Sequence, residues 1–333
     1  MTRCSVALCT YNGARHLPDQ LESIVSQTRR PDELVVSDDG SGDGTLDILR
    51  RFAAQAPFPV RLQHNAKTAG VTKNFENAIR LCEGDWIALS DQDDVWRPTK
   101  LKVLEASLDG ADQPGVVFTD AEVVDEELRP LGYTLWDAIG FDRGRRRAAR
   151  KGRLLDVLLW RNVVTGATMA FRSGLRARIL PLPGVWLHDA WIAVIGSVTD
   201  RAAMVEEPTI QYRQHAAAQI GADKPSLRRG VARAMTTPAS DLVRQLRQWE
   251  AARERIVALG GSGSTDAAVR IGRKMAHLAA RARMPGPTWR RIPAVAAELV
   301  TLNYHRYSSG WRSAARDLVQ RAGQRGAIAN DSV

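Results

Sequence analysis

The chain has 333 residues, of which 44% are hydrophobic and 25% charged, and its formal net charge is +10. This is ordinary globular composition, and it excludes collagen, a coiled coil and a chain disordered throughout. Residues 220–333 hold 20 Lys and Arg against 8 Asp and Glu, whereas residues 1–219 are close to neutral. Length and charge therefore predict a near-neutral body followed by a basic tail, which favours a polyanionic partner.

The first 125 residues alternate between short apolar runs and amphipathic segments. We predict strands at 3–9, 33–37, 60–63, 86–90 and 116–124, and helices at 16–27, 43–55, 71–82 and 97–108. Strands and helices that alternate with short connections form a mostly parallel sheet flanked by helices. The continuous apolar strands fit a sheet that is buried on both faces. The body is therefore predicted to be an α/β domain.

The pattern changes after residue 125. Residues 143–153 hold seven Arg and Lys, and we expect an exposed loop there. It is either a solvated segment or a contact for phosphate on an anionic lipid or a lipid-diphosphate acceptor. A helix at 154–160, a strand at 166–171 and a helix at 188–198 follow. From about residue 220 the spacing of Ala, Arg and Leu predicts an all-helical appendage.

Two classes of segment are missing from the sequence. No run approaches the ~20 apolar residues of a spanning helix, and no apolar core of a signal peptide is present, so we expect a cytoplasmic protein. The cysteines Cys4, Cys9 and Cys82 have no CxxC spacing. They therefore predict neither a disulfide framework nor a zinc site. Cys4 and Cys9 lie in an apolar run and are expected to be buried.

Polar residues follow three predicted strands at the point where each strand ends. The segments are TYNG at 10–13, SDDGSGDGT at 37–45 and SDQDDVW at 90–96. Ligands of open parallel sheets bind beyond the carboxyl ends of the strands, so these segments predict a single crevice. Asp91 and Asp93 suit Mg²⁺ or Mn²⁺ held together with phosphate oxygens. The alternative is an acidic turn that is merely solvated or caps the next helix.

In their order and spacing these motifs, with Gln27-Thr28, resemble glycosyltransferase family 2, which has the GT-A fold of nucleotide-diphospho-sugar transferases. The resemblance covers about residues 1–215. Asn74-Phe75 and the segments 162–166, 187–191 and 212–215 are similar to a rhamnosyltransferase-like branch. The resemblance implies a catalytic domain at 1–219, with a nucleotide-sugar half at 1–125 and an acceptor half at 154–219. Residues 220–333 are then a basic helical C-terminal region.

The resemblance also assigns roles to individual residues. It implies that Asp39 pairs with a pyrimidine N–H, that Asp38 supports the ribose side, and that Asp189 is the catalytic base. It implies a DXD metal motif made by Asp91 and Asp93. The residues implied in nucleotide-sugar binding are Thr10, Tyr11, Asn12, Asp38, Asp39, Asn74 and Asp91. A second group of candidates near the site is His188, Trp191, Arg213 and His215.

Each of these side chains also has a purely structural interpretation. Asp189 opens an apolar helix and could be its N-cap. His188 fits packing or support of Asp189, and Trp191 fits either the core or a sugar ring. Arg213 and His215 could be solvated residues after a strand.

The resemblance implies direct displacement with inversion at the anomeric carbon and a divalent cation on the departing diphosphate. The implied donor is dTDP-rhamnose, with UDP-sugars as the alternative. The implied acceptor is a lipid-linked or polysaccharide glycan of the cell surface. A metal-dependent nucleotidyltransferase or phosphohydrolase could use the same acidic crevice. A degenerate, non-catalytic module is disfavoured, because both the base and the metal motif are present.

The basic tail has three interpretations. It packs on the catalytic domain, it lies on the anionic inner face of the plasma membrane, or it binds nucleic acid. Basic residues together with Trp289, Tyr304, Tyr307 and Trp311 favour peripheral membrane contact. Nucleic acid is not expected as a partner, because no DNA-binding motif is present.

Overall fold

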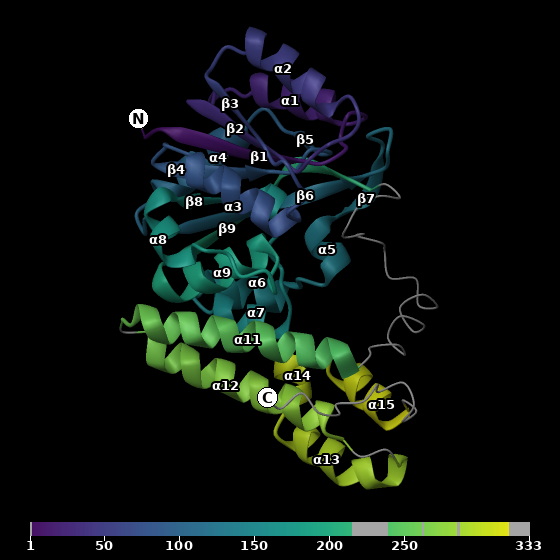
Figure 1. Cartoon of the computed structure of the whole chain (residues 1–333). Coiled ribbons are helices and arrows are strands. Elements are labelled where there is room, and N and C mark those ends of the chain that lie inside the picture. The colour runs from purple at the N-terminus through teal and green to yellow at the C-terminus, as the bar shows by residue number, and fades with distance from the viewer. Residues whose placement is uncertain (1, 215–238, 262, 285–286, 320–333) are drawn as a thin grey trace. The chain divides into compact units, whose positions relative to one another are not determined.

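The computed structural model describes residues 2–214, 239–261, 263–284 and 287–319. By its internal contacts the chain divides into two compact units (Figure 1). The first unit comprises residues 1–154 and 163–222, and the second comprises 155–162 and 223–333. The candidate His215 lies outside the described residues.

The first half of unit one follows the predicted alternation. Its elements are β1 (Cys4–Thr10), α1 (Leu17–Val25), β2 (Glu33–Asp38), α2 (Thr45–Gln55), β3 (Val60–His64), α3 (Val71–Leu81) and β4 (Trp86–Ser90). The four strands pair in parallel in the order β3-β2-β1-β4. All residues of β1, β2 and β4 are buried. The apolar runs form buried strands because helices cover both faces of a parallel sheet.

The second half of unit one completes the sheet. Its elements are β5 (Val95–Trp96), α4 (Lys100–Leu108), β6 (Val116–Val124), β7 (Pro130–Thr134), α5 (Leu135–Ile139), α6 (Arg143–Arg150), β8 (Met169–Arg172), α8 (Arg176–Ile179), α9 (His188–Thr199) and β9 (Ala202–Arg213). The strand order continues β4-β8-β6-β9-β5, and β7 pairs with β6. Strand β8 is antiparallel to both of its neighbours, and β5 is antiparallel to β9. The sheet is therefore mixed: β3, β2, β1 and β4 pair in parallel and β6 is parallel to β9, whereas the pairs made by β8, β5 and β7 are antiparallel.

The basic segment 143–153 is a helix over most of its length, and the prediction of a loop is wrong there. Asp142 caps helix α6, because its carboxylate accepts a hydrogen bond from the backbone N–H of Arg145 at 3.0 Å. Arg146 pairs with Asp137 at 3.0 Å, and Arg150 pairs with Glu206. These acids offset the repulsion between neighbouring arginines, and Arg and Ala are good helix formers.

The sequence analysis assumed a strand before Arg213 but gave no bounds for it, and the structure places β9 there. Its segment contains two glutamates followed by Pro208, which interrupt any regular apolar pattern. The parallel register between β6 and β9 shifts where Pro208 lies opposite Asp120. A proline lacks the N–H that a central strand needs, so it is tolerated at such an irregularity. Beyond it, Ile210 and Gln211 pair with β5 and bring the end of β9 beside the DQDD segment.

The three cysteines are free and buried, as expected for Cys4 and Cys9. Burial raises the pKa of each of the three thiols, and that of Cys82 reaches about 12. The thiols are therefore protonated, apolar parts of the core.

The second unit is helical throughout its described residues. Its helices are α7 (Leu154–Trp160), α11 (Ala239–Leu259), α12 (Ser264–Ala282), α13 (Thr288–Val300), α14 (Asn303–Tyr307) and α15 (Trp311–Val319). Helices α11 and α12 pack along each other. Met284, Val295, Tyr304 and Ala314 form a small core. In the part of the chain that the structure describes, no helix is both long enough and apolar enough to cross a bilayer.

Helix α7 was predicted to belong to the acceptor half, but residues 155–162 group with the helical unit. Six of its seven residues are apolar, and Asp156 is the exception. Asp156 pairs with Arg270 of α12. An apolar helix with one acid opposite a basic partner is explained by packing within the helical unit.

Candidate active site

Three polar segments meet at one edge of the sheet in unit one. Strands β2, β1 and β4 are adjacent and parallel, so their carboxyl ends lie side by side. Thr10 ends β1, Asp38 ends β2 and Ser90 ends β4. The three segments therefore lie along one edge of the sheet, which is where the sequence predicted a crevice.

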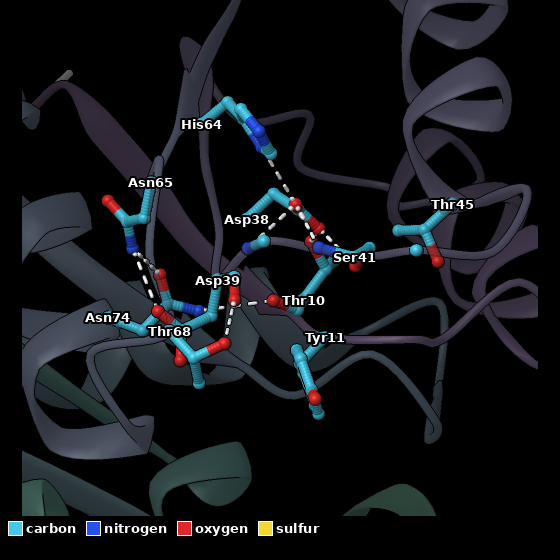
Figure 2. A network of polar contacts seen from close by, with 12 residues as sticks. Thr10, Tyr11, Asp38, Asp39, Ser41, Thr45, His64, Asn65, Thr68 and Asn74 are labelled. Atoms are coloured by element: carbon cyan, nitrogen blue, oxygen red, sulfur yellow. Dashed lines mark hydrogen bonds and ion pairs between the residues drawn. The ribbon is translucent and has the colours of Figure 1, made fainter.

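Asp38 lies at the centre of a hydrogen-bond network (Figure 2). Its carboxylate accepts bonds from the Thr10 hydroxyl at 2.7 Å, the Ser41 hydroxyl at 2.6 Å and Nδ1 of His64 at 3.1 Å. The backbone N–H groups of Gly40 and Ser41 donate as well. Burial would raise the pKa of Asp38, but these bonds outweigh burial and hold its pKa below the usual value. Five donors use the acceptor capacity of one carboxylate within the protein.

Asp39 faces the loop between β3 and α3. One carboxylate oxygen accepts from the backbone N–H of Ala69 at 2.8 Å and the other from that of Gly70 at 2.9 Å. The Asn65 amide adds a third bond at 3.1 Å, as Figure 2 shows. Oδ1 accepts two of these bonds, but Oδ2 accepts only the one from Gly70 and retains acceptor capacity, so Asp39 is fixed in position and can still accept from a ligand N–H. Gly70 has φ of 86°, a conformation that favours glycine.

Asn74 and Asn65 form a buried pair beneath this loop. The Asn74 side chain donates to the backbone oxygen of Thr10 at 3.2 Å and accepts from Asn65 at 3.1 Å. Asn74 therefore ties α3 to the end of β1. Asn65 is a residue that the sequence analysis missed, and no local motif marks it.

The segment 10–13 is held against its neighbours through backbone contacts. Gln92 accepts from the Tyr11 N–H at 2.8 Å and donates to the Tyr11 carbonyl at 3.0 Å. Asn12, with φ of 47°, accepts from the Gly42 N–H at 2.8 Å. A Cβ on Gly13 would lie 2.2 Å from Oε1 of Gln92, so a larger residue here would displace the Gln92 side chain from its bonds to Tyr11. The Tyr11 ring is 49% exposed and offers an aromatic face at the crevice.

The acidic segment after β4 concentrates negative charge. Desolvation, together with the charges of Asp93 and Asp189, raises the pKa of Asp91 to about 7. Burial and the charges of Asp93 and Asp91 also raise the pKa of Asp94, whose Oδ2 is buried without a hydrogen-bond partner among the described residues. Such uncompensated carboxylates suit a hard divalent cation.

The donor set for such a cation is limited. Among the described residues, no group of three or more His, Cys, Asp and Glu side chains could hold a metal ion. Asp91 and Asp93 supply two carboxylates, and Mg²⁺ and Mn²⁺ sites of this kind take phosphate oxygens and water as their remaining ligands. The residues present therefore fit a cation that arrives with a diphosphate.

A buried lysine lies close to these acids and was missed by the sequence analysis. Lys100 is fully buried, donates to the Ala167 carbonyl at 2.6 Å, and lies 3.5 Å from the centre of the Trp96 ring. Burial lowers its pKa, while Asp94 and Asp91 act in the opposite direction. The lysine therefore partly balances the charge of the acidic segment.

Arg213 braces the acidic segment from β9. Its guanidinium donates to the carbonyl of Asp93 at 2.9 Å and to the carboxylate of Asp19 at 2.8 Å, and it also donates to the carbonyl of Glu126. Its backbone N–H donates to Asp94 at 3.1 Å. The side chain is buried and its donors face protein acceptors, so its geometry is that of a support for the DQDD turn.

Asp189 lies in the first turn of α9. Its carboxylate accepts from the Ala190 N–H at 2.5 Å and the Gly166 N–H at 3.2 Å. The first bond lies within the first turn of α9, whose N-cap residue is Leu187 and not Asp189, and the second ties α9 to Gly166 in the turn before β8. Burial raises the pKa of Asp189 to about 6. Its charge also acts on Asp91, so it belongs to the same crevice.

The candidates beside Asp189 have structural roles. The His188 ring stacks on Phe75 with centroids 3.7 Å apart, and burial lowers its pKa to about 3. A Cβ on Gly166 would lie 2.5 Å from Nε2 of His188, so the ring packs directly on that glycine. Trp191 is buried and donates to the Ile179 carbonyl at 2.8 Å. Trp191 is therefore core and does not stack on a sugar.

Tyr212 lies in the segment 212–215 that resembles the rhamnosyltransferase-like branch, but the sequence analysis assigned it no role. Burial and the charges of Asp94, Asp91, Asp93 and Asp189 raise the pKa of its hydroxyl. The phenol therefore lies within electrostatic range of all four acids and stays protonated. The signal that could have found it is its place beside Arg213 in the motif that ends β9.

Comparison with known proteins now identifies the family. The family model described as glycosyl transferase family 2 matches residues 5–171, half of the chain. The chain belongs to glycosyl transferase family 2. The match covers Thr10, the two aspartates that end β2 and the DQDD segment, but not Asp189 or β9.

Relatives of this family-2 chain match it in part. An uncharacterised protein of Mycobacterium tuberculosis is 26% identical over 225 residues, which cover 64% of this chain and 59% of that protein. The dTDP-rhamnosyl transferase RfbG of Shigella flexneri is 36% identical over 99 residues, 28% of this chain and 34% of the relative. The alignments thus span less than two thirds of the length of these relatives.

Solved structures show the fold. TarS 1–349 of S. aureus in complex with UDP-GlcNAc superimposes with a TM-score of 0.56 at 15% identity, over 95% of this chain and 89% of that one. The mannosyltransferase PcManGT of Pyrobaculum calidifontis, in complex with GDP-Man and Mn²⁺, has a TM-score of 0.54 at 20% identity, over 91% and 75%. This likeness confirms the GT-A fold with a C-terminal helical region.

Proposed function

We propose that the chain transfers a sugar from a nucleoside-diphosphate donor to an acceptor hydroxyl. The observation that carries the proposal is that the charge of the buried Asp189 contributes to the raised pKa of Asp91 in the DQDD segment. A buried carboxylate with a pKa of about 6 then lies beside two carboxylates that fit a cation on a diphosphate. One proton acceptor and one leaving-group site are what an inverting transfer needs.

The donor would bind at the joined ends of β1 and β2. We assign the base to the Tyr11 ring and to Asp39, and the ribose to the segment around Thr10 and Asn12. Asp38 supports the ribose side through Ser41 and Thr10, because its own oxygens are occupied. The donor we propose is dTDP-rhamnose, which the partial match to the Shigella enzyme supports. UDP-sugars are the alternative, since TarS was solved with UDP-GlcNAc.

Asp189 performs the acid–base part of the proposed reaction. Its carboxylate takes the proton of the acceptor hydroxyl as that oxygen attacks the anomeric carbon, and the configuration inverts. The backbone N–H groups of Gly166 and Ala190 hold the carboxylate in place. Asp91 and Asp93 would hold Mg²⁺ or Mn²⁺, which supplies positive charge for the departing diphosphate when bound. No covalent enzyme intermediate is required.

The acceptor we propose is a lipid-linked or polysaccharide glycan made for the cell surface. The exposed basic side chains of α6 support an anionic acceptor, because Arg143, Arg147 and Lys151 project from unit one without an acidic partner among the described residues. We therefore place the protein at the inner, anionic face of the plasma membrane.

Product analysis tests the reaction class. With a dTDP-sugar, a divalent cation and acceptor membranes, we expect one nucleoside diphosphate for each sugar transferred. Chromatography separates it from pyrophosphate and from orthophosphate. Release of either of those as the first product would instead identify a nucleotidyltransferase or a phosphohydrolase.

The pH profile tests the role of Asp189. A base must be ionised, so kcat/KM for the donor and acceptor pair is expected to fall below a pKa of about 6. The slope should approach a tenfold loss per pH unit in the acid limb. Initial rates at fixed metal concentration measure it. A rate that stays flat down to about pH 4.5 would show that a carboxylate of ordinary pKa, or no base, serves the reaction.

A further inference from the structure

The outward face of helix α13 is apolar. Its exposed side chains recur at helical spacing and are Trp289, Ile292, Pro293, Ala296 and Val300. Trp289 is 67% exposed, Ile292 55% and Val300 84%, whereas Arg291 on the same helix is fully buried. A helix on the surface of a soluble protein normally has the opposite polarity. We call these five residues the α13 stripe.

Helix α15 repeats the pattern. Trp311, Ala315 and Val319 are spaced by four residues and are exposed, with 67% exposure for Trp311 and for Val319. We call these three residues the α15 stripe. Single exposed apolar side chains are common, but two exposed apolar stripes in 32 residues of one unit call for a partner.

The charges around the stripes are all of one sign. The exposed charged side chains between residues 288 and 319 are Arg290, Arg306 and Arg312. The guanidinium of Arg290 lies over the Trp289 ring, 4.9 Å from its centre. The partner surface must therefore offer an apolar layer to the stripes and anionic groups to the arginines.

The two acids of this segment point inward. Glu298 pairs with Nδ1 of His277, and Asp317 pairs with Arg281 at 2.7 Å. The Tyr304 hydroxyl donates to Asp317 at 2.7 Å, and the Arg291 guanidinium donates to the Asp317 carbonyl at 3.0 Å. This buried network fixes the orientation of the helices, so that the acids are hidden and the apolar side chains are presented.

The network also separates the four aromatic residues of the tail for which membrane contact was predicted. Tyr304 and Tyr307 are buried, so their predicted contact with a membrane is wrong. Trp289 and Trp311 remain outside. Tryptophan beside arginine is typical of the interface between lipid headgroups and acyl chains.

We propose that the α13 and α15 stripes dock on an anionic phospholipid surface. A second copy of the chain would bring two sets of arginines together, which like-charge repulsion opposes. A nucleic acid would engage the arginines and leave the apolar stripes in water. An anionic bilayer offers acyl chains to the apolar stripes and anionic headgroups to the arginines. The proposal extends the proposed function by naming the surface that holds the transferase near its acceptor, and it is tested without donor or acceptor.

The test is co-sedimentation of the full chain with vesicles. One set of vesicles is phosphatidylcholine alone, and the other contains phosphatidylglycerol as well. We expect binding to the anionic vesicles, weakened by high salt. The variant Trp289→Ser/Ile292→Ser/Val300→Ser should lose at least about tenfold in partition. Trp289→Phe should remove much of the blue shift of tryptophan fluorescence on binding.

A matched control uses exposed apolar residues of the same unit outside the stripes. Val257 of α11 is 57% exposed and Val269 of α12 is 49% exposed. The variant Val257→Ser/Val269→Ser should bind as the wild type does. Circular dichroism verifies that both variants are folded.

Three outcomes would overturn the proposal. They are absence of wild-type binding to anionic vesicles, equal binding by the triple variant, and a wild-type dimer in sedimentation equilibrium that the triple variant abolishes. Release of nucleoside diphosphate by the triple variant is measured separately in detergent. Loss of vesicle binding with retained release separates this proposal from the proposed transfer.

Discussion

Replacing Asp189 by asparagine is expected to lower kcat by about 10³-fold while the protein stays folded. The amide cannot accept the proton of the attacking hydroxyl, and a positioned general base typically contributes 10²–10⁴-fold. KM for the donor should change little, because Asp189 lies at the start of α9. The proposed nucleotide site is instead on the loops that follow β1 and β2. Initial rates of nucleoside diphosphate release at saturating donor measure the effect.

The thermal stability of the variant distinguishes a catalytic role of Asp189 from a role that only anchors the start of its helix. The folded pKa of Asp189 is about 6 and the unfolded value about 4, so the folded state holds the extra proton between these values. Stability therefore falls as pH rises through this window, and the ionised carboxylate destabilises the fold at neutral pH. Asparagine removes that cost but loses one of the two bonds from Gly166 and Ala190, a loss of ~1 kcal/mol or more. The two effects oppose each other, so Tm should shift by only a few degrees.

The control is the same substitution at the other end of the same helix. Asp200 follows α9 and pairs with Arg178. Asp200→Asn should lower Tm slightly and leave kcat near the wild-type value. If Asp189→Asn kept most of its activity, or if it lost activity only in proportion to a large fall in Tm, Asp189 would only anchor the start of α9 and would not be the base.

The sheet and its acidic edge could be predicted from the sequence because local signals determine them. The runs that form β1, β2 and β4 are mostly apolar, and each is followed within two residues by Asp or Asn, which are poor in strands. Parallel strands then place their carboxyl ends together. This is why the crevice was expected without any knowledge of long-range contacts.

The roles of neighbouring aspartates could not be predicted in the same way. Asp38 and Asp39 are adjacent in the sequence. The carboxylate of Asp38 accepts hydrogen bonds from Thr10, Ser41 and His64, whereas that of Asp39 faces the Gly70 loop. Which way each side chain points depends on loops that lie up to 31 residues away along the chain. The residue pattern by itself shows two equivalent carboxylates, and only the family resemblance assigned them different roles.

Arg213 shows the same limit over a longer range. Its partners, Asp19 and Asp93, precede it by 194 and 120 residues. Arg213 ends strand β9, whose apolar pattern is interrupted in the sequence by two glutamates and Pro208. An arginine after a strand without predicted bounds resembles a solvated residue, and only the tertiary structure shows that it is buried.

Asp93→Asn is expected to remove the dependence of nucleotide binding on a divalent cation. Asp91 and Asp93 are the two carboxylates available to a cation, and desolvation together with the charges of Asp93 and Asp189 raises the pKa of Asp91 to about 7. Removing the charge of Asp93 removes one metal ligand and relieves the repulsion on Asp91. The cation should then bind the diphosphate complex more weakly, and kcat/KM should fall by ~10²-fold or more.

Isothermal titration with a nucleoside diphosphate measures this directly, without turnover. For the wild type, Mn²⁺ should tighten binding relative to EDTA, whereas the two titrations of Asp93→Asn should coincide. Asp47→Asn on α2 is the control, because Asp47 is an exposed acid of the same unit that pairs only with Arg50 among the described residues. Its titrations should match the wild type. A variant that kept the full response to Mn²⁺ would place the cation elsewhere, and the buried, unpaired oxygen of Asp94 would then be the next ligand to test.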